Sequence, residues 1–314
     1  MNAAISFNQL LKEYINAFDS PNSRLAYIRD LKQYQVWCQT EGLNDLLKVE
    51  PATASAYRDF LVSQFSTKTM ERKLSAVKGM YRLASEKEII SNNPFYEIRP
   101  PEKKKVSKKV SVKPLSISDV ERILLFPELK SKEGFRDYVM LFVMFSLGLK
   151  IGEVVNIHVK DFKKYETGFL VHLRKLDGRS YYSKVPANCL ALINKYINEC
   201  HIKGFLFTSL AKNAGQEQEK RTPLTPRSGW CILKRYLRKS RLDLKGRTTN
   251  CAREFFIQTL IIEGLSLEAL RKTLGLQSMN AMRRYGIEDL KTAKDQLSFK
   301  DHPVDRIRLQ IREY

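Results

Sequence analysis

The chain has 314 residues, of which 43% are hydrophobic, and a mean hydropathy of −0.37. This length suits about two domains, and no stretch approaches the roughly 20 apolar residues that a membrane span needs. Lys and Arg number 55 against 34 Asp and Glu, which gives a net charge of +21 and an isoelectric point near 9.7. We therefore expect a cytoplasmic protein, without a signal peptide or membrane partner, that binds a polyanion. A basic protein with no specific partner is the alternative.

Cysteine usage bears on metal binding and on redox compartment. The five cysteines are widely spaced, with no Cys-x-x-Cys motif and no neighbouring pair of histidines. This pattern argues against a disulfide framework and against a zinc site. We expect free thiols in a reducing compartment, no metal and no cofactor. No feature of the sequence indicates a small-molecule substrate.

The first 99 residues predict a small all-helical domain. Apolar side chains recur at helical spacing in four segments, at 5–18, about 25–38, 51–64 and 67–87. In the second segment we expect Leu25 to face the core, and Gly42 just past its end is a helix stop signal. Pro51 suits the first turn of the third segment.

A basic segment with flanking prolines follows at 100–114. It contains six lysines, among them Lys103, Lys104 and Lys105, and almost nothing apolar except valines. This composition predicts an extended linker between two domains. A solvated tether is one interpretation of the lysines. In a DNA-binding protein they would also displace counterions from phosphates.

The remainder, 115–314, predicts a second domain. A long apolar helix is expected at Asp137–Leu149. Alternating residues around 169–173 and 181–185, with an Asp-Gly turn between them, predict a β-hairpin. Helices resume near Ala187. The fold class is therefore mainly α with a small β-hairpin or sheet.

A strongly basic stretch lies within this second domain. Between Glu219 and Arg253 there are eleven Lys or Arg against two acidic residues, a density that suits contact with phosphates. The candidates for this contact are Lys234, Arg235, Arg247 and Arg253. Trp230 and Tyr236 fit the apolar face of a helix better than a base-stacking platform, so we expect both in the core.

Four segments of the chain resemble the tyrosine recombinases, the phage integrase family. The core-binding domain of that family is similar to SRLAYIRDLKQYQVWCQTEG and STKTMERKLSAVKGMYRLASEKEIISNNPFYEI. Its catalytic domain is similar to LFVMFSLGLKIGEVVNIHVKDF and TTNCAREFFIQTLIIEGLSLEALRKTLGLQSMNAMRRYGIED. The resemblance implies a two-domain clamp around double-stranded DNA, with self-association of protomers on inverted half-sites. In active members a tyrosine attacks a phosphodiester without a metal, and cationic side chains stabilise the phosphate.

Some catalytic positions of the family are retained in this chain. By resemblance, the nucleophile is Tyr285 and the second arginine is Arg253. The acidic residue after the first arginine is Glu153, and Lys175 matches the hairpin lysine loosely. If Tyr285 is no longer a nucleophile, it packs or forms a hydrogen bond on the helix predicted at Ala281–Leu290.

Other catalytic positions are altered. The first arginine is replaced by Lys150, which keeps the charge but loses the planar fork that grips two phosphate oxygens. The histidine of the HxxR motif becomes Asn250, which has no ionisable proton. A later histidine or tryptophan becomes Leu276, which has no donor, and Glu254 places a negative charge beside a phosphate site.

The second and fourth helices carry cations that could face a DNA groove. We expect base or phosphate contacts from Arg24, Lys32, Lys68, Arg72, Lys73, Lys78 and Arg82. An ordinary solvated helix face is the alternative interpretation.

Three hypotheses follow. The first is a sequence-specific DNA-binding protein of recombinase fold that has lost catalysis and acts as a transcriptional repressor, in its most specific form maintaining the lysogeny of a temperate phage. The second is an active or weakly active recombinase that forms a 3′-phosphotyrosine through Tyr285, with Asn250 donating in place of histidine. The third is an architectural protein that bends recombination sites for a separate enzyme.

Overall fold

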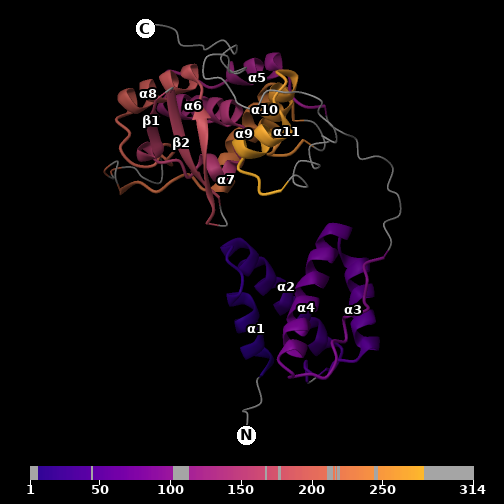
Figure 1. The fold of residues 1–314 in the computed structure, drawn as a ribbon. Helices are drawn as coiled ribbons and strands as arrows, with labels where there is room; N and C mark the ends of the chain where they lie inside the picture. The colour runs from indigo at the N-terminus through magenta and orange to yellow at the C-terminus, as the bar shows by residue number, and fades with distance from the viewer. Residues whose placement is uncertain are drawn as a thin grey trace. The chain divides into compact units, whose positions relative to one another are not determined.

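The computed structural model describes residues 6–43, 45–101, 113–166, 168–175, 178–210, 215, 217, 220–243 and 247–278. The chain forms two compact units, a helical unit with α1–α4 and a mixed unit with α5–α11 and the sheet (Figure 1). The predicted linker lysines Lys103, Lys104 and Lys105, and the predicted nucleophile Tyr285 with its helix, lie outside the described residues. Within the described part, no helix combines the length and hydropathy that a membrane crossing requires.

The helical unit confirms the four predicted helices. They are α1 (Phe7–Asn16), α2 (Pro21–Thr40), α3 (Pro51–Gln64) and α4 (Thr67–Glu86). Their starts follow from capping, because Ser6 and Ser20 accept hydrogen bonds from the backbone of the first turns of α1 and α2. The prediction for Leu25 was wrong: its side chain is 53% exposed, because the buried stripe of α2 runs instead through Leu31 and Tyr34.

Aromatic side chains fill the core of the helical unit. The hydroxyl groups of Tyr34 and Tyr81 lie 2.8 Å apart and form a hydrogen bond between α2 and α4. The rings of Tyr57 and Phe95 pack edge-on against Tyr34, at 4.7 and 5.8 Å between centroids. Burial raises the pKa of all three tyrosines of this cluster, so their hydroxyls stay neutral. The core thus fixes α2 against α4.

The mixed unit contains the remaining elements. These are α5 (Ile117–Leu124), α6 (Lys132–Leu147), α7 (Ile151–Val154), the 3₁₀ turn η1 (Val159–Asp161), β1 (Phe162–Tyr165), β2 (Gly168–Arg174), β3 (Ser180–Val185), α8 (Ala187–Cys200), α9 (Pro226–Lys239), α10 (Cys251–Ile262) and α11 (Leu267–Thr273). Helix α6 is buried on all sides and packs against α8, α10 and β3. It begins earlier than the predicted Asp137, because Ser131 caps it.

The sheet is a three-stranded antiparallel meander in the order β1-β2-β3. The predicted hairpin is confirmed as β2 and β3, which pair Phe169 with Val185. Strand β1 was not predicted, and it pairs Phe162 with Val171. Helix α9 buries Tyr236 as expected, whereas Trp230 is only half-buried against the core.

Candidate functional site

The retained Arg253 lies in the first turn of α10 and is fully buried. Its Nε donates to the carbonyl of Gly148 at 2.8 Å, and its Nη2 donates to Oε2 of Glu153 at 2.5 Å. Gly148 ends α6 in the left-handed conformation, at φ +59°, where an added Cβ would lie 2.4 Å from the ring of Phe256. A glycine is needed there to bring this carbonyl to the arginine.

Glu153 contacts both Lys150 and Arg253, the residues that the resemblance placed at the two arginine positions. Its Oε2 also accepts the backbone N–H of Lys150 at 2.8 Å, in a capping box at the start of α7. The Lys150 side chain itself is exposed, whereas Glu153 is buried. The structure therefore brings Lys150, Glu153 and Arg253 together around one carboxylate.

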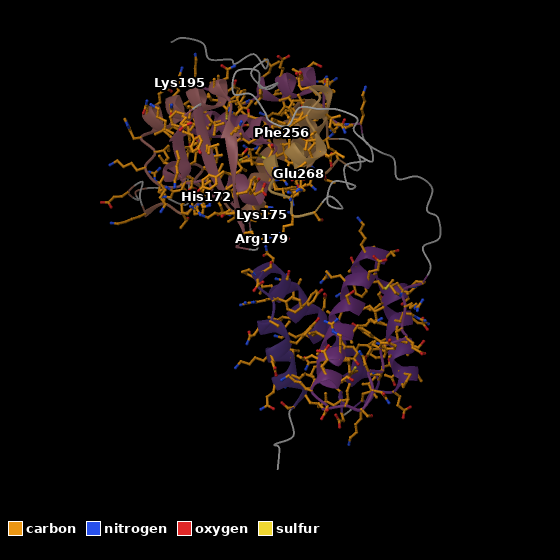
Figure 2. All side chains as sticks on the ribbon, in the orientation of Figure 1. His172, Lys175, Arg179, Lys195, Phe256 and Glu268 are labelled. Atoms are coloured by element: carbon orange, nitrogen blue, oxygen red, sulfur yellow. The ribbon has the colours of Figure 1, made fainter. Side chains whose placement is uncertain are left out.

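The hairpin lysine, Lys175, lies near the same centre. Its Nζ donates to the carbonyl of Gly275 and lies 5.1 Å from the ring centroid of Tyr181. Figure 2 labels Lys175 in the mixed unit. Burial raises the pKa of the Tyr181 phenol, with Glu153 adding to the rise and Arg253 opposing it. Tyr181 therefore connects Lys175 to the buried ion pair. Tyr181 was not predicted from the sequence as part of the site. The one sequence feature that indicated it is its position near the start of β3, the strand that follows Lys175.

The altered positions lie at the edge of this cluster. Asn250 is exposed at the N-terminal end of α10 and makes no side-chain capping bond. Leu276 packs half-buried against the core, and its backbone carbonyl accepts from Arg271 at 2.8 Å. Burial raises the pKa of Glu254, and Arg247 opposes this rise. None of these three side chains places a cation or an ionisable nitrogen near Arg253.

Of the cations predicted to contact DNA from the helical unit, three are tied to the protein. Lys73 is buried, and its Nζ lies 3.0 Å from Oδ1 of Asp30. Arg24 donates from its Nε to the carbonyl of Phe18. Lys78 donates to the carbonyl of Ile98 at 2.8 Å, and burial beside Arg99 lowers its pKa.

The other four cations of this group face solvent. Lys32 and Lys68 are exposed, and Arg82 is exposed with Glu86 3.5 Å from its Nε. Arg72 is exposed at its outer edge while it donates to Asp30. Of these four solvent-facing cations, Arg72 is the one whose guanidinium is also held by a buried carboxylate.

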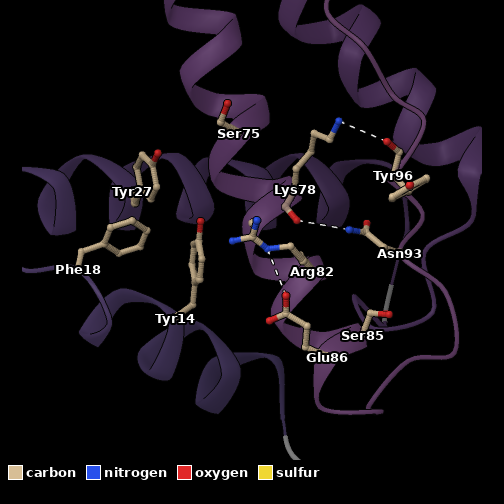
Figure 3. Close-up of a pocket in the computed structure, with 11 residues that line it drawn as sticks. Tyr14, Phe18, Tyr27, Ser75, Lys78, Arg82, Ser85, Glu86, Asn93 and Tyr96 are labelled. Carbon is tan, nitrogen blue, oxygen red and sulfur yellow. Dashed lines mark hydrogen bonds and ion pairs between the residues drawn. The ribbon is translucent and has the colours of Figure 1, made fainter. Parts of the chain in front are cut away.

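Helix α4 also forms the floor of a hollow of about 770 Å³ (Figure 3). The rings of Tyr14, Phe18 and Tyr27 form one wall and contact one another at 4.8 to 6.2 Å between centroids. Burial raises the pKa of Tyr14 to about 12. Lys78 and Arg82 lie across the floor, so an aromatic wall adjoins two of the predicted DNA contacts.

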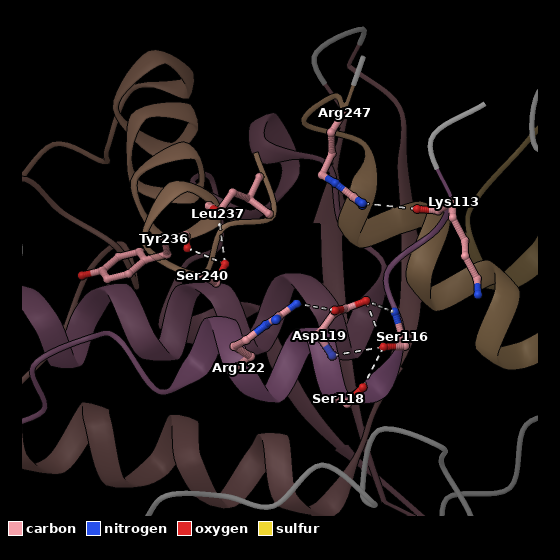
Figure 4. A network of polar contacts seen from close by, with 9 residues as sticks. All are labelled: Lys113, Ser116, Ser118, Asp119, Arg122, Tyr236, Leu237, Ser240 and Arg247. Carbon is pink, nitrogen blue, oxygen red and sulfur yellow. Dashed lines mark hydrogen bonds and ion pairs between the residues drawn. The ribbon is translucent and has the colours of Figure 1, made fainter. Parts of the chain in front are cut away.

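In the mixed unit, two of the predicted cations, Lys234 and Arg235, lie on α9 itself. Lys234 lies 5.0 Å from the ring centroid of Trp230, and Arg227 lies 4.7 Å from the same ring. Arg235 is mostly exposed and lies 3.5 Å from the buried carboxylate of Asp137. Arg247 donates to the carbonyl of Lys113 at 3.3 Å, beside the capping network of α5 (Figure 4). Trp230 thus supports cations at the surface of α9.

No cluster of metal ligands was found in the described part of the chain. The polar groups of the candidate site are the guanidinium of Arg253, the ammonium of Lys175, the carboxylate of Glu153 and the phenol of Tyr181.

Comparisons with known proteins identify the family of the chain. Residues 113–290 match the phage integrase family, and residues 7–88 match the phage integrase N-terminal SAM-like domain. The chain is 26% identical over 313 residues to the tyrosine recombinase XerC of Leptospira interrogans, covering 96% of this chain and 95% of that protein. It is 22% identical over 285 residues to XerD of Staphylococcus haemolyticus, covering 88% of this chain and 92% of that protein.

A solved structure shares the fold. The XerH site-specific recombinase bound to its difH substrate superposes with a TM-score of 0.64 at 16% identity, over 91% of this chain and 83% of that one. The mainly helical two-domain architecture predicted from the sequence is confirmed by this likeness.

Proposed function

Because this chain belongs to the phage integrase family, the tyrosine recombinases, we propose that it binds specific double-stranded DNA sequences and represses transcription instead of recombining DNA. XerH, a structural neighbour, is bound to its difH substrate. The net charge of +21 and the exposed cations of α2, α4 and α9 provide the phosphate contacts that such binding requires.

The altered catalytic positions support a loss of chemistry. Lys150, Asn250 and Leu276 replace an arginine, a histidine and a further donor of the family. Loss of one preorganised donor to a charged transition state costs about 2.7–4 kcal/mol, or roughly 100- to 1000-fold in rate. Even when such effects are far from additive, three losses leave little catalysis.

The burial of Arg253 is the observation that carries this proposal. Two of its nitrogens donate to Gly148 and Glu153, and none of the side chain is exposed. A cation that binds a phosphate oxygen in the transition state must present N–H groups to it. We infer that Arg253 now stabilises the fold, while the basic surfaces keep the capacity to hold DNA. A protein that encloses DNA without cleaving it could act as a repressor. A temperate phage encodes an integrase of this fold, from which a repressor that maintains lysogeny could derive.

Genome-wide occupancy tests the proposal. Crosslinking and sequencing of wild type and Tyr285→Phe, at one stated salt concentration, should give many promoter-proximal sites that both proteins occupy equally. Depletion of the protein should raise transcription from those promoters. A single inverted repeat at an integration junction, with no change in transcription, would contradict repression.

Active recombination is the second candidate function. Lys175 and Arg253 both adjoin Tyr181, so two retained cations still share one site, and the relatives are named recombinases. This function predicts an SDS-resistant protein–DNA adduct on a bound site, lost in Tyr285→Phe.

A restoration variant separates the two candidates further. Lys150→Arg, Asn250→His and Leu276→His in one chain replace the missing donors. If only those donors are missing, cleavage of a bound site should appear in this variant and not in wild type. Adducts in wild type would establish an active enzyme.

A further inference from the structure

The carboxylate of Asp30 is buried between α2 and α4. Asp30 is 1% exposed, yet it lies on a helix whose other buried side chains are apolar or aromatic. Its Oδ1 accepts from Nζ of Lys73 at 3.0 Å, and its Oδ2 accepts from Nη1 of Arg72. A buried carboxylate is stable only when such partners satisfy it. Asp30 therefore fixes two cations of α4, which come from 42 and 43 residues further along the chain.

The two cations differ in what remains available to a ligand. The Lys73 side chain is 9% exposed, and its ammonium also bonds to Gln33. The Arg72 side chain is 41% exposed, and one nitrogen of its guanidinium is held by Asp30. A guanidinium has five N–H donors in a rigid plane. Arg72 therefore has an anchored inner edge and an outer edge that faces solvent.

The other exposed cations of α2 and α4 lack this anchoring. Lys32 and Lys68 are flexible point charges, which suit phosphates and carry no sequence information. Arg82 is 73% exposed and pairs with Glu86, which is 62% exposed, and such an exposed pair has little energetic weight. Among the described candidates on these two helices, Arg72 alone combines exposure with a buried anchor.

We propose that Arg72 is the residue of the helical unit that reads a guanine in the major groove, and that Asp30 is a positioning residue that aims it. The inference rests on the proposed DNA binding and deepens it. Arginine pairs with O6 and N7 of guanine through two parallel N–H groups, and this contact requires a fixed plane. The Asp30 carboxylate fixes that plane before DNA arrives, so less side-chain entropy is lost on binding.

Selection from a randomised duplex pool by the full-length protein tests the assignment. Wild type should enrich one sequence with a required guanine. Arg72→Lys and Arg72→Ala should lose discrimination at that one base pair by about 5- to 100-fold, with the other positions unchanged. Arg72→Lys keeps the positive charge but loses the planar guanidinium, so it distinguishes paired hydrogen bonding to guanine from electrostatic attraction alone. Arg58→Ala removes an arginine of α3 that pairs with the exposed Asp59 and is not among the predicted DNA contacts, and it should keep every base preference.

A second set of variants tests the role of Asp30. Asp30→Asn alone leaves Lys73 buried without its carboxylate and is expected to destabilise the unit. Lys73→Met retains the Arg72–Asp30 pair, and the double variant Asp30→Asn/Lys73→Met removes the anchor without an unpaired buried cation. The double variant should weaken the preference for the guanine at the position that Arg72 sets, and Lys73→Met should not, at equal folded fractions by circular dichroism.

The outcomes separate this inference from the proposed function. A uniform loss of affinity at all positions in the Arg72 variants would make Arg72 a phosphate contact and overturn the assignment. A wild-type protein that enriches a sequence, together with Arg72 variants that enrich the same one, would also overturn it while leaving DNA binding intact. A wild-type protein that enriches nothing would overturn both.

Discussion

At the scale of single residues, Arg253 forms a buried ion pair at the candidate site. Its side chain is fully buried and paired with the Glu153 carboxylate, which is 5% exposed. The pair joins α10 to the turn between α6 and α7. Removal of one member of a buried pair leaves the other charge uncompensated, which costs more than the pair contributes.

We expect Arg253→Met to lower the free energy of unfolding by about 3–5 kcal/mol, because Glu153 is left buried and unpaired. Urea denaturation measures this. The double variant Arg253→Met/Glu153→Met should recover much of the loss, since no buried charge remains. Equal stability of Arg253→Met and wild type would show that the pair is not buried in solution.

Glu254, the next residue, gives a pH-dependent prediction. Burial raises its pKa above the ordinary 4.5, so its ionised form disfavours folding. The folded state then holds this proton more tightly than the unfolded state, and stability falls as pH rises through the folded pKa. Glu254→Gln should therefore melt at a higher temperature than wild type at pH 7, and the difference should vanish below pH 4.5. Glu97→Gln, at an exposed glutamate, should show no such gain.

At the scale of elements, the positions of α6 and α10 depend on the turn at Gly148. The left-handed conformation at φ +59° ends α6, and Phe256 of α10 packs where a side chain would be. The absence of a Cβ therefore allows α6 and α10 to approach closely enough for the carbonyl of Gly148 to reach Arg253.

We expect Gly148→Ala to destabilise the mixed unit by about 1–3 kcal/mol more than Gly264→Ala, because only the first substitution overpacks a core. Gly264 also has a left-handed φ, +80°, but an added Cβ meets nothing within 4 Å. Thermal melts compare the two variants: Gly264→Ala measures the backbone strain of a left-handed residue, and Gly148→Ala adds the steric clash with Phe256. Equal losses would show that Phe256 moves aside without cost.

Elements with a clear period were predicted from the sequence, and short or long-range features were not. The helices of the helical unit repeat their apolar residues every 3.6 positions, so their number and order were predictable. Helix α7 and strand β1 have four residues each, too few for a period. The burial of Lys73 depends on Asp30, 43 residues earlier, and no local pattern reports that contact.

The candidate site divides in the same way. Lys150, Asn250, Arg253 and Lys175 were named from the sequence because motifs carry them. Tyr181 was not, because its role depends on strand β3 lying against α11. The inward orientation of Arg253 follows from a left-handed glycine and a carboxylate about 100 residues away, and only the folded structure shows it.

At the scale of the whole molecule, the excess of 21 positive charges favours association with a polyanion such as DNA, and we predict that the lysines at 103–105 contribute to it. Each phosphate that a lysine neutralises contributes about 0.9 to the slope of log affinity against log salt. If the lysines at 103–105 contact phosphates as predicted from the sequence, they should change affinity without reading bases.

We expect replacement of Lys103, Lys104 and Lys105 by Gln to lower that slope by about 2 to 3, with base preferences unchanged. Binding to one selected duplex between 50 and 200 mM salt, conditions in which phosphate contacts dominate, measures it. The Lys→Arg triple variant keeps the charge and should keep the slope. A changed sequence preference in the Gln variant would indicate base contacts by the linker.

The hydrogen bond from Arg253 to Gly148 can form only late in translation, because its two residues lie far apart in the sequence. Its two partners are 105 residues apart, and the buried helix α6 ends at Leu147 whereas α10 begins at Cys251. During translation α6 leaves the ribosome long before the helix that covers it, so its apolar surface awaits a late partner. A nascent chain that ends before Cys251 lacks both the helix that covers α6 and the arginine that donates to the carbonyl of Gly148. Chaperone binding to such a stalled chain should therefore persist until α10 has emerged.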